Sequence, residues 1–193
     1  MYENANGERY EGSFDNGQMD GEGKLYRKGK LIYEGNFKCN EFHGEGKLYN
    51  PDKNTIYEGE FRNGKKEGRG VLVDNGKQTK YDGEFRENEK CGNGTYLFGN
   101  RKYVGEFEKG KFNGKGKLTF SNRDVYEGEF LDNKKHGKGE LKLDSINQHY
   151  FGDFRNDLID GNGTLTYANE DKFVGHFVEG KKNGEGKYVR NNR

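Results

Sequence analysis

Large apolar side chains alternate with small or polar ones along this chain, and the alternation repeats every 22 to 24 residues. Residues 57–72, YEGEFRNGKKEGRGVL, show one copy. When its first aromatic residue is numbered 0, glycine stands at +2, +11 and +13, phenylalanine at +4 and an apolar residue at +15. A period of two residues is typical of a β-strand, and the polar stretch between the halves is typical of a turn. Each copy is therefore predicted to form a β-hairpin. The copies begin at Tyr10, Tyr33, Tyr57, Tyr81, Tyr103, Tyr126, Tyr150 and Phe173.

The glycines within the strands are predicted to make room for aromatic rings. Pairing positions that sum to 15 sets Tyr57 opposite Leu72, Gly59 opposite Gly70, and Phe61 opposite Gly68, all on one face of the hairpin. A bare glycine pair lets a ring or a neighbouring backbone approach closely. Position +7 is glycine, asparagine or aspartate in every copy, which predicts one residue with positive φ in each turn.

One hairpin alone buries too little surface to fold, so neighbouring copies must supply the missing contacts. The predicted fold is all-β: an elongated, twisted antiparallel sheet of stacked β-hairpins, with about sixteen strands at two per copy and no substantial helix. Residues 1–193 are predicted to form a single array. In it, residues 1–9 resemble the tail of a preceding repeat or an N-terminal cap.

Charge and hydropathy exclude several classes of function. The 34 basic and 33 acidic side chains leave a net charge of +1, which gives no overall field to attract nucleic acid. No apolar run is long enough to span a membrane, and the first residues lack the apolar stretch of a secretory signal. A cytoplasmic location, associated with the cytoskeleton or a membrane, is therefore predicted.

The pattern YEGEFxNGxxxGxGxL resembles the MORN repeat (membrane occupation and recognition nexus) over residues 10–189. The resemblance implies stacked hairpins with an aromatic-lined groove. It also implies a non-enzymatic scaffold that docks protein partners through this groove and the hairpin tips. Two alternatives stay open: a peripheral membrane module that binds anionic phosphoinositides, and a regulatory repeat domain of a larger enzyme.

The recurrent aromatic residues are predicted to form the core first of all. A groove left open beside them would dock an extended or helical segment of a partner. The candidate residues are Tyr33, Phe37, Tyr57, Phe61, Tyr81, Phe85, Tyr103, Phe107, Tyr126, Phe130, Tyr150 and Phe154.

The hairpin tips, at positions +8 to +10, vary while the frame stays constant, as expected of loops that carry function. Basic pairs in three tips are either solvated turns or contacts to lipid headgroups. Apolar tip residues either fold back onto the sheet or contact a partner or a second copy of the chain. The basic tip residues are Lys65, Lys66, Lys134, Lys135, Lys181 and Lys182. The apolar ones are Met19, Phe42, Phe112, Leu158 and Ile159. Exposed edge strands offer a second route to a homo-oligomer.

Reactive side chains are few. Cys39 and Cys91 lie two copies apart, too far for a disulfide within one chain, so free thiols are predicted. Cys39 and His43 flank one turn as Cys-x3-His, and zinc there would need further ligands from a second chain or from Cys91 and His136. No histidine has a nucleophile and an acid at the spacing of a catalytic triad, and no loop resembles a phosphate cradle. The sequence therefore predicts no enzyme and no cofactor beyond this zinc possibility.

Replacing Phe107 by alanine tests the assignment of the core. We expect the free energy of unfolding to fall by about 3–5 kcal/mol, because burial is lost and a cavity remains. Denaturant titration of both proteins measures the difference. A loss below about 1 kcal/mol, as at a surface position, contradicts the assignment.

Overall fold

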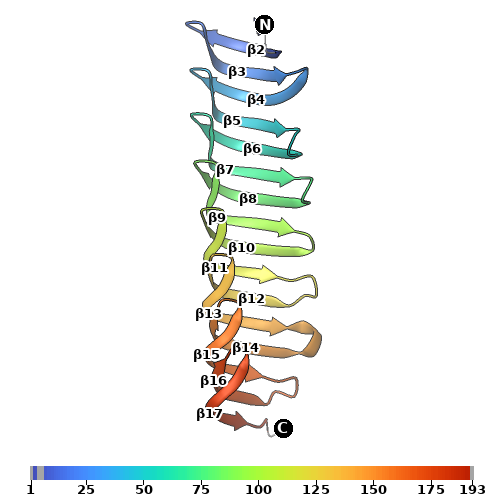
Figure 1. Cartoon of the computed structure of the whole chain (residues 1–193), viewed down its shortest axis with the longest axis vertical. Helices are drawn as coiled ribbons and strands as arrows, with labels where there is room; N and C mark the ends of the chain where they lie inside the picture. Colours follow the sequence, from blue (N-terminus) through green and yellow to red (C-terminus); the bar gives the residue numbers. More distant parts are fainter. Residues whose placement is uncertain (1, 4–6, 192–193) are drawn as a thin grey trace. The chain divides into compact units, whose positions relative to one another are not determined.

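The structure, a computed structural model, describes residues 2–3 and 7–191. The chain divides into two compact units, Met1–Gly99 and Asn100–Arg193. Each unit is an antiparallel sheet in which every strand pairs with the next along the chain (Figure 1). No α-helix occurs in the described residues.

The strands of the first unit are β1 (Tyr2–Glu3), β2 (Glu8–Asp15), β3 (Gln18–Arg27), β4 (Lys30–Lys38), β5 (Glu41–Asn50), β6 (Thr55–Arg62), β7 (Lys65–Asp74), β8 (Thr79–Arg86) and β9 (Glu89–Phe98). The second unit contains β10 (Arg101–Glu108), β11 (Lys111–Thr119), β12 (Val125–Leu131), β13 (Lys134–Leu143), the short 3-10 helix η1 (Asp144–Ile146), β14 (Gln148–Arg155), β15 (Leu158–Thr166), β16 (Lys172–Val178) and β17 (Lys181–Val189). Of the predicted N-terminal cap, residues 1 and 4–6 lie outside the described residues, whereas Tyr2 pairs with Tyr10.

Every hairpin turns through two left-handed residues, where the sequence predicted one. In the third copy, Asn63 (φ 50°) and Gly64 (φ 73°) join Arg62 to Lys65, which pair with each other. Two consecutive residues with positive φ in a two-residue loop make a type I′ turn, whose twist matches that of the strands. The first of the two positions was missed because asparagine, aspartate, cysteine, glutamate and lysine all occur there.

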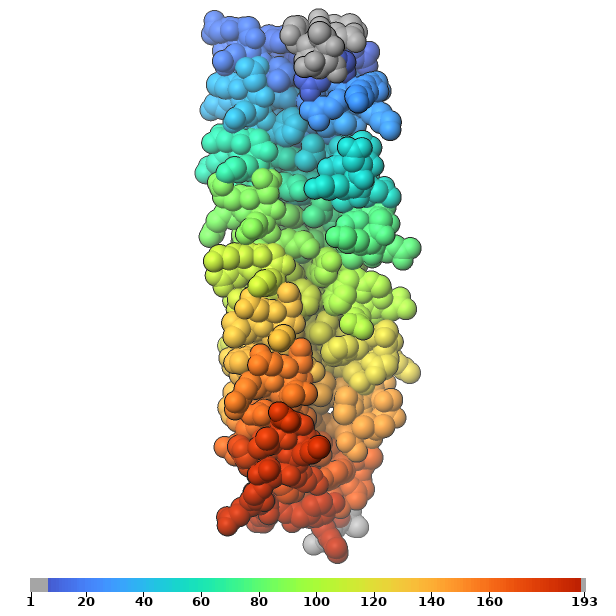
Figure 2. Space-filling model, viewed as in Figure 1, coloured from blue at the N-terminus to red at the C-terminus, as the bar shows by residue number. Residues whose placement is uncertain are grey.

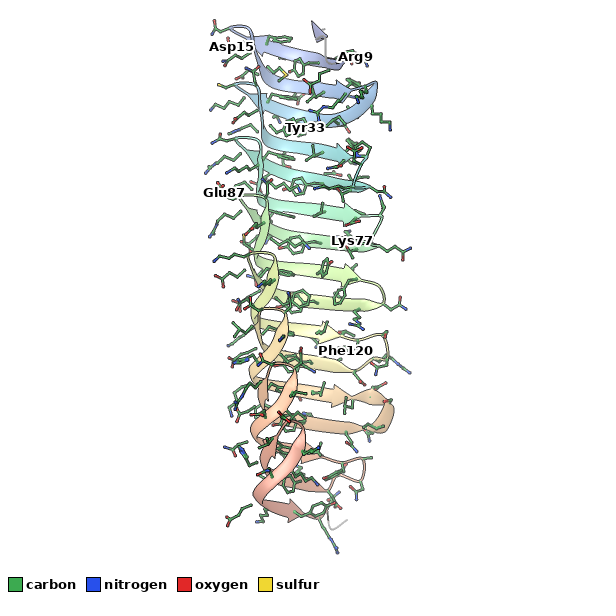
Figure 3. All side chains as sticks on the ribbon, viewed as in Figure 1. Arg9, Asp15, Tyr33, Lys77, Glu87 and Phe120 are labelled. Carbon is green, nitrogen blue, oxygen red and sulfur yellow. The ribbon has the colours of Figure 1, made fainter. Side chains whose placement is uncertain are left out.

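The short turn also moves the predicted tips into strands. Positions +8 to +10 belong to the second strand of each hairpin, so Lys65 and Lys66 begin β7 instead of lying in a loop. In Figure 3, Asp15 and Glu87 lie at the turn end of their hairpins and Lys77 lies at the opposite end. Tyr33 lies between the turn end and the opposite end.

The predicted register is right at one end of the hairpin and wrong at the other. Tyr57 pairs with Leu72, and Gly59 with Gly70, as predicted. Phe61, however, pairs with Lys66 and not with Gly68, across a register shift after Gly59. A two-residue turn pairs positions that sum to 13, so the second strand must accommodate two extra residues as a β-bulge. Gly68 instead pairs with Phe85 of the following copy.

The glycine at +11 serves this bulge. Gly68 has a φ of 62°, and the equivalent glycine has a positive φ in all eight copies. In the bulge, a carboxylate oxygen of Glu60 accepts a hydrogen bond from the backbone N–H of Arg69 at 2.8 Å. A Cβ on Gly68 would lie 2.5 Å from that carboxylate. Glycine is needed here for its backbone conformation and for the capping carboxylate, and not as a partner for phenylalanine.

The other two glycines accommodate the tyrosine ring, as predicted. A Cβ on Gly70 would lie 2.5 Å from Cζ of Tyr57, and a Cβ on Gly59 would lie 2.5 Å from Cα of Gly70. The Tyr57 hydroxyl donates a hydrogen bond to the carbonyl oxygen of Glu60 at 2.9 Å. The tyrosine therefore lies flat across the glycine pair and anchors the strand where the bulge begins.

The core of each unit is a row of these tyrosines with the phenylalanines at +4. Tyr57 makes edge-to-face contacts with Phe61 of its own copy and with Phe85 of the next, both with ring centroids 5.0 Å apart. Phe107 is 5% exposed and contacts Tyr103 edge-to-face at 5.2 Å. The buried residues are Tyr10, Tyr33, Phe37, Tyr57, Phe61, Tyr81, Phe85, Tyr103, Phe107, Tyr126, Phe130, Tyr150, Phe154 and Phe177. Such pairs stabilise by about 0.5–1.5 kcal/mol each beyond the area that they bury.

Alanine at Gly70 and at Gly64 separates the two uses of glycine. Gly70→Ala displaces the Tyr57 ring, so we expect the free energy of unfolding to fall by about 2–4 kcal/mol. Gly64 has open space around it, so its alanine variant meets only the cost of a left-handed conformation, about 1–2 kcal/mol. Gly64→Asn, the residue found at this position in other copies, should be near neutral. Equal losses at Gly70 and Gly64 in denaturant titrations would contradict the ring-on-glycine contact.

The inner face as a candidate binding surface

The candidate surface is the face of each sheet that carries positions 0, +4, +9 and +15, here called the inner face. The opposite outer face carries +1, +3, +12 and +14. Figure 2 shows the first unit, in blue to green, as two columns of protruding side chains with a recess between them. The aromatic residues predicted to line a groove are at most 5% exposed, so they form the floor beneath the inner face.

The apolar residues at +9 fold back onto this floor. Phe42 stacks on Tyr33 with ring centroids 3.9 Å apart, and Phe112 stacks on Tyr103 at 3.7 Å. Met19 and Ile159 occupy the same position in their copies and are half-buried. Leu158, one position earlier, is 48% exposed. Packing on the chain's own rings therefore accounts for Phe42 and Phe112, and contact of these residues with a partner remains a prediction.

Lysine replaces the apolar residue at +9 in the other four copies. In the first unit, the Lys66 ammonium lies 5.2 Å from the centroid of the Tyr57 ring. The Lys90 ammonium lies 5.0 Å from the Tyr81 ring and 4.0 Å from the Tyr96 ring. The second lysine of the predicted basic tip is thus turned onto the aromatic floor.

The second unit repeats this arrangement. The Lys135 ammonium lies 5.7 Å from the ring centroid of Tyr126, and 5.9 Å from those of Phe120 and Phe154. The Lys182 ammonium lies 4.6 Å from the Phe173 ring and 5.2 Å from the Tyr167 ring. Contacts of a cation with ring faces return only part of the hydration that a lysine loses on burial.

Burial removes water from the ammonium groups of three of these lysines, and no carboxylate among the described residues replaces it. Desolvation lowers the pKa of Lys66 and of Lys135, and lowers the pKa of Lys90 to about 8, with a smaller contribution from the charge of Lys77. Over the part of the chain that the structure describes, no carboxylate lies within ion-pair distance of Lys66, Lys90, Lys135 or Lys182. The inner face therefore carries positive charge that the chain itself does not neutralise.

The first lysine of each predicted pair behaves differently. Lys65, Lys134 and Lys181 are exposed, as is Lys182, whereas Lys66 and Lys135 are half-buried. Lys65 forms an ion pair with Glu87. Lysines on the outer face are also paired across neighbouring copies: Lys47 lies 3.1 Å from Glu58. Of the six lysines predicted to contact a lipid headgroup, the structure thus turns Lys66, Lys135 and Lys182 toward the inner face.

Several residues of the surface were missed by the sequence analysis. Lys90 follows Glu89, so its tip did not look like a basic pair, although it occupies the same +9 position as Lys66. The +15 residue was placed on the aromatic face but not in the candidate site, and the half-buried ring at +17 was overlooked. In the first unit, Tyr96 at +15 and Phe98 at +17 stack with centroids 5.1 Å apart. The alignment of the copies at positions +9, +15 and +17 contained the signal.

A cavity of about 430 Å³ with one apolar wall opens in the first unit, at the end of the hairpins opposite the two-residue turns. Its apolar wall is formed by Leu25, Ile32, Phe42, Leu48, Tyr49 and Pro51. Arg27, Lys28, Lys30, Asn50 and Asp52 make up the rest of its lining. Leu48 pairs with Tyr57, whose ring faces the Lys66 ammonium, so the cavity adjoins the lysine-bearing part of the inner face.

The outer face of the first unit holds a wider, polar depression of about 810 Å³. Its lining contains five glutamates and two lysines, and each lysine pairs with one glutamate: Lys24 with Glu34 at 3.5 Å and Lys47 with Glu58 at 3.1 Å. Exposed pairs of this kind contribute little to stability. The lining of the outer-face depression carries more carboxylates than lysines, whereas the inner face carries unpaired lysines.

The candidate metal ligands do not belong to a larger cluster of metal-binding side chains among the described residues. Cys39 lies exposed in a turn, His43 lies half-buried at +10 of the same hairpin, and Cys39 and Cys91 are both free thiols. Among the described residues, no three or more His, Cys, Asp or Glu side chains gather where they could hold a metal ion. The zinc prediction at Cys39 and His43 therefore still requires ligands from a second chain. No described helix has the length and apolar character needed to cross a membrane.

Lys90→Met tests the electrostatic state of the inner face. The folded pKa of Lys90 lies below its unfolded value, so the unfolded chain binds more protons and stability rises with pH between about 8 and 10. Between pH 7 and pH 9 we expect the wild type to gain roughly 0.5–1 kcal/mol relative to Lys90→Met, after allowance for solvent screening. Urea titrations at both pH values measure it. Lys80→Met, at an exposed lysine, is the control, and a pH-independent difference for Lys90→Met contradicts the assignment.

Comparison with known proteins places the fold. The solved structure "SAS-4 (dCPAP) TCP domain in complex with a Proline Rich Motif of Ana2 (dSTIL) of Drosophila Melanogaster" matches with a TM-score of 0.51 at 14% identity, over 88% of this chain and 90% of that one. The TCP10c domain of Drosophila melanogaster Sas-4 matches at a TM-score of 0.46 and 14% identity, over 89% and 99% of the two chains. At this identity the first match shows similarity of fold alone. No curated protein matches the chain.

The family comparison is more specific. The model of the MORN repeat matches residues 10–30, 33–55, 57–77, 81–101, 103–125, 126–144, 150–172 and 173–193. Each match begins at the aromatic residue that the sequence pattern identified as position 0. This chain belongs to the MORN repeat family.

Proposed function

We propose that the chain is a non-enzymatic scaffold whose inner face docks an extended, proline-rich segment of a protein partner. The observation that carries the proposal is the distance at which equivalent residues of neighbouring copies recur along the inner face. Equivalent positions in neighbouring copies, such as Lys66 on β7 and Lys90 on β9, lie two strands apart in the sheet. At about 4.7–4.9 Å per strand, this is about 9.4–9.8 Å.

A polyproline II helix has nearly the same period. It advances about 3.1 Å per residue with three residues per turn, so one of its faces recurs about every 9.3 Å. A β-strand presents successive side chains to opposite sides and cannot repeat one face every three residues. A polyproline II segment running across the strands therefore presents one equivalent residue to each copy.

The ring surfaces of the inner face suit such a ligand. Proline-rich segments dock in grooves lined by aromatic side chains, because their rings pack against flat aromatic surfaces and their conformation is already fixed. Tyr96 and Phe98 in the first unit, and Phe120 and Tyr167 in the second, are half-buried rings beside the inner-face lysines. The fold neighbour whose structure contains a proline-rich motif supports the choice of ligand, although its contacts cannot be transferred at 14% identity.

The location and the assembly follow from the same proposal. We infer a cytoplasmic module associated with the cytoskeleton or a membrane, as expected of a docking array in this family. Self-association through edge strands and attachment to a larger enzyme remain predictions.

Binding of fluorescent proline-rich peptides to the full chain tests the function. Peptides about twelve residues long, varied at every third position, would be compared by anisotropy with composition-matched glycine-rich peptides. We expect proline-rich members to bind, and Phe98→Ala to weaken them about tenfold through lost ring contact. Leu97→Ala is the matched control, since the neighbouring residue is 39% exposed and alternates to the opposite face.

Two outcomes contradict the proposal. Proline-rich peptides that bind no better than glycine-rich ones remove its basis. The second contradicting outcome would come from sedimentation with vesicles at about 0.15 M salt. At this salt concentration, interactions between surface charges are screened beyond roughly 8 Å. Pelleting that requires phosphoinositide and is lost in Lys134→Glu with Lys181→Glu would instead favour the membrane alternative.

A further inference from the structure

We propose that the first unit selects its partner by charge: the docked segment carries one apolar residue and, on one side of it in sequence, acidic residues three and six positions away. This rests on the proposed function and specifies the chemistry of the ligand. The four +9 residues of the unit, in chain order, are Met19, Phe42, Lys66 and Lys90. Its inner face is thus apolar in the first two copies and cationic in the last two.

The spacing follows from the sheet. Phe42 lies on β5, Lys66 on β7 and Lys90 on β9, and consecutive strands of the unit pair with one another. Each step from one of these residues to the next therefore covers two strand spacings, or about one turn of polyproline II. Ligand residues that face Phe42, Lys66 and Lys90 are three apart in sequence, in whichever direction the segment runs.

Acidic residues suit the cationic copies because the lysines there lack anions. The Lys66 and Lys90 ammonium groups lie over tyrosine rings, and no described carboxylate pairs with either. Three other lysines of the unit are paired: Lys24 with Glu34, Lys47 with Glu58, and Lys65 with Glu87. Among the described residues of the unit, the other lysines that form no ion pair are exposed to solvent: Lys28, Lys30, Lys38, Lys53 and Lys80. Lys66 and Lys90 differ from these because they are half-buried, so they lose hydration without gaining an anion.

The surroundings of the two lysines add positive charge. Lys53 acts on Lys66, and Lys77 and Lys66 act on Lys90, all three lowering the pKa of the lysine they face, whereas Asp74 is the one acid that opposes this at Lys90. A carboxylate that enters from a ligand would relieve this repulsion and form a charge-assisted hydrogen bond in a partly desolvated site. A neutral ligand residue would leave the repulsion in place.

An apolar residue suits the preceding copy. The cavity of about 430 Å³ beside Phe42 and Leu48 is large enough for a leucine-sized side chain. It adjoins the Tyr57 ring under Lys66 through the Leu48–Tyr57 pair, so both kinds of contact lie along one continuous surface. The ligand pattern is therefore apolar-x-x-acid-x-x-acid or its reverse, with proline favoured at the x positions.

The test uses the full chain and three labelled peptides, each flanked by prolines, in anisotropy titrations. The first contains Leu-Pro-Pro-Glu-Pro-Pro-Glu, the second replaces both Glu by Gln, and the third, Leu-Pro-Pro-Glu-Pro-Glu-Pro, keeps the composition and changes the spacing. Net contributions of hydrogen bonds to charged groups correspond to about tenfold in affinity for each pair. We expect the second peptide to bind at least thirtyfold more weakly than the first, and the third about tenfold more weakly.

Variants assign the effect to the two lysines. Lys66→Gln with Lys90→Gln should abolish the preference for Glu over Gln, and thermal melts verify that this chain folds. The matched control, Lys47→Gln with Lys65→Gln, removes the same charge from paired lysines and should keep the preference.

The remaining outcomes overturn the proposal in distinguishable ways. If the Gln peptide binds as well as the Glu peptide and Phe98→Ala weakens both, the docking function stands and the charge selection is wrong. If the Glu preference persists in Lys66→Gln with Lys90→Gln, the site is wrong. If none of the three peptides binds, and the reversed peptide Glu-Pro-Pro-Glu-Pro-Pro-Leu does not bind either, the ligand pattern is wrong. Binding of the proline-rich peptides varied at every third position then decides whether the docking function stands. Displacement of the Glu peptide by phosphoinositide vesicles, but not by neutral ones, would assign the lysines to lipid.

Discussion

The contact on which the rest of each hairpin depends is the tyrosine ring lying across a pair of glycines. It requires Gly59 and Gly70 to be opposite each other, because a Cβ on Gly70 would overlap the Tyr57 ring. The ring then carries its hydroxyl to the carbonyl of Glu60, which fixes the strand at the start of the bulge. The same ring is packed edge-to-face by phenylalanines of two copies, so the local contact also joins neighbouring hairpins.

The bulge reconciles two demands that a regular hairpin cannot meet together. A type I′ turn and the tyrosine–glycine contact favour registers that differ by two residues, and the extra length is taken up around Gly68, with its left-handed backbone. The Glu60 carboxylate satisfies a backbone N–H exposed by this irregularity. The three glycines of each copy thus have different structural roles: two make space for the tyrosine ring, and one adopts the left-handed conformation of the bulge.

The turn also decides what the inner face presents. Because it has only two residues, position +9 lies in a strand and directly opposite the +4 phenylalanine, as Lys66 lies opposite Phe61. Side chains there must contact the tyrosine floor, and either a ring or an aliphatic stem with an ammonium group can do so. Variation at this single position changes the inner face from apolar to cationic without altering the frame, which lets one fold present different ligand-binding surfaces.

The sequence by itself determined the repeat, the strand period, the aromatic core and the close approach of tyrosine to the glycine pair. These depend on side-chain size at positions that recur eight times, so the pattern is independent of distant contacts. Only the tertiary structure decided the bulge, the second left-handed turn residue and the inward direction of Lys66, Lys90, Lys135 and Lys182. In these cases the residue type is permissive: glycine suits both a ring contact and a left-handed bend, and lysine suits both solvent and a ring face. The two-residue turn, together with the tyrosine ring packed on its glycine pair, resolved each choice.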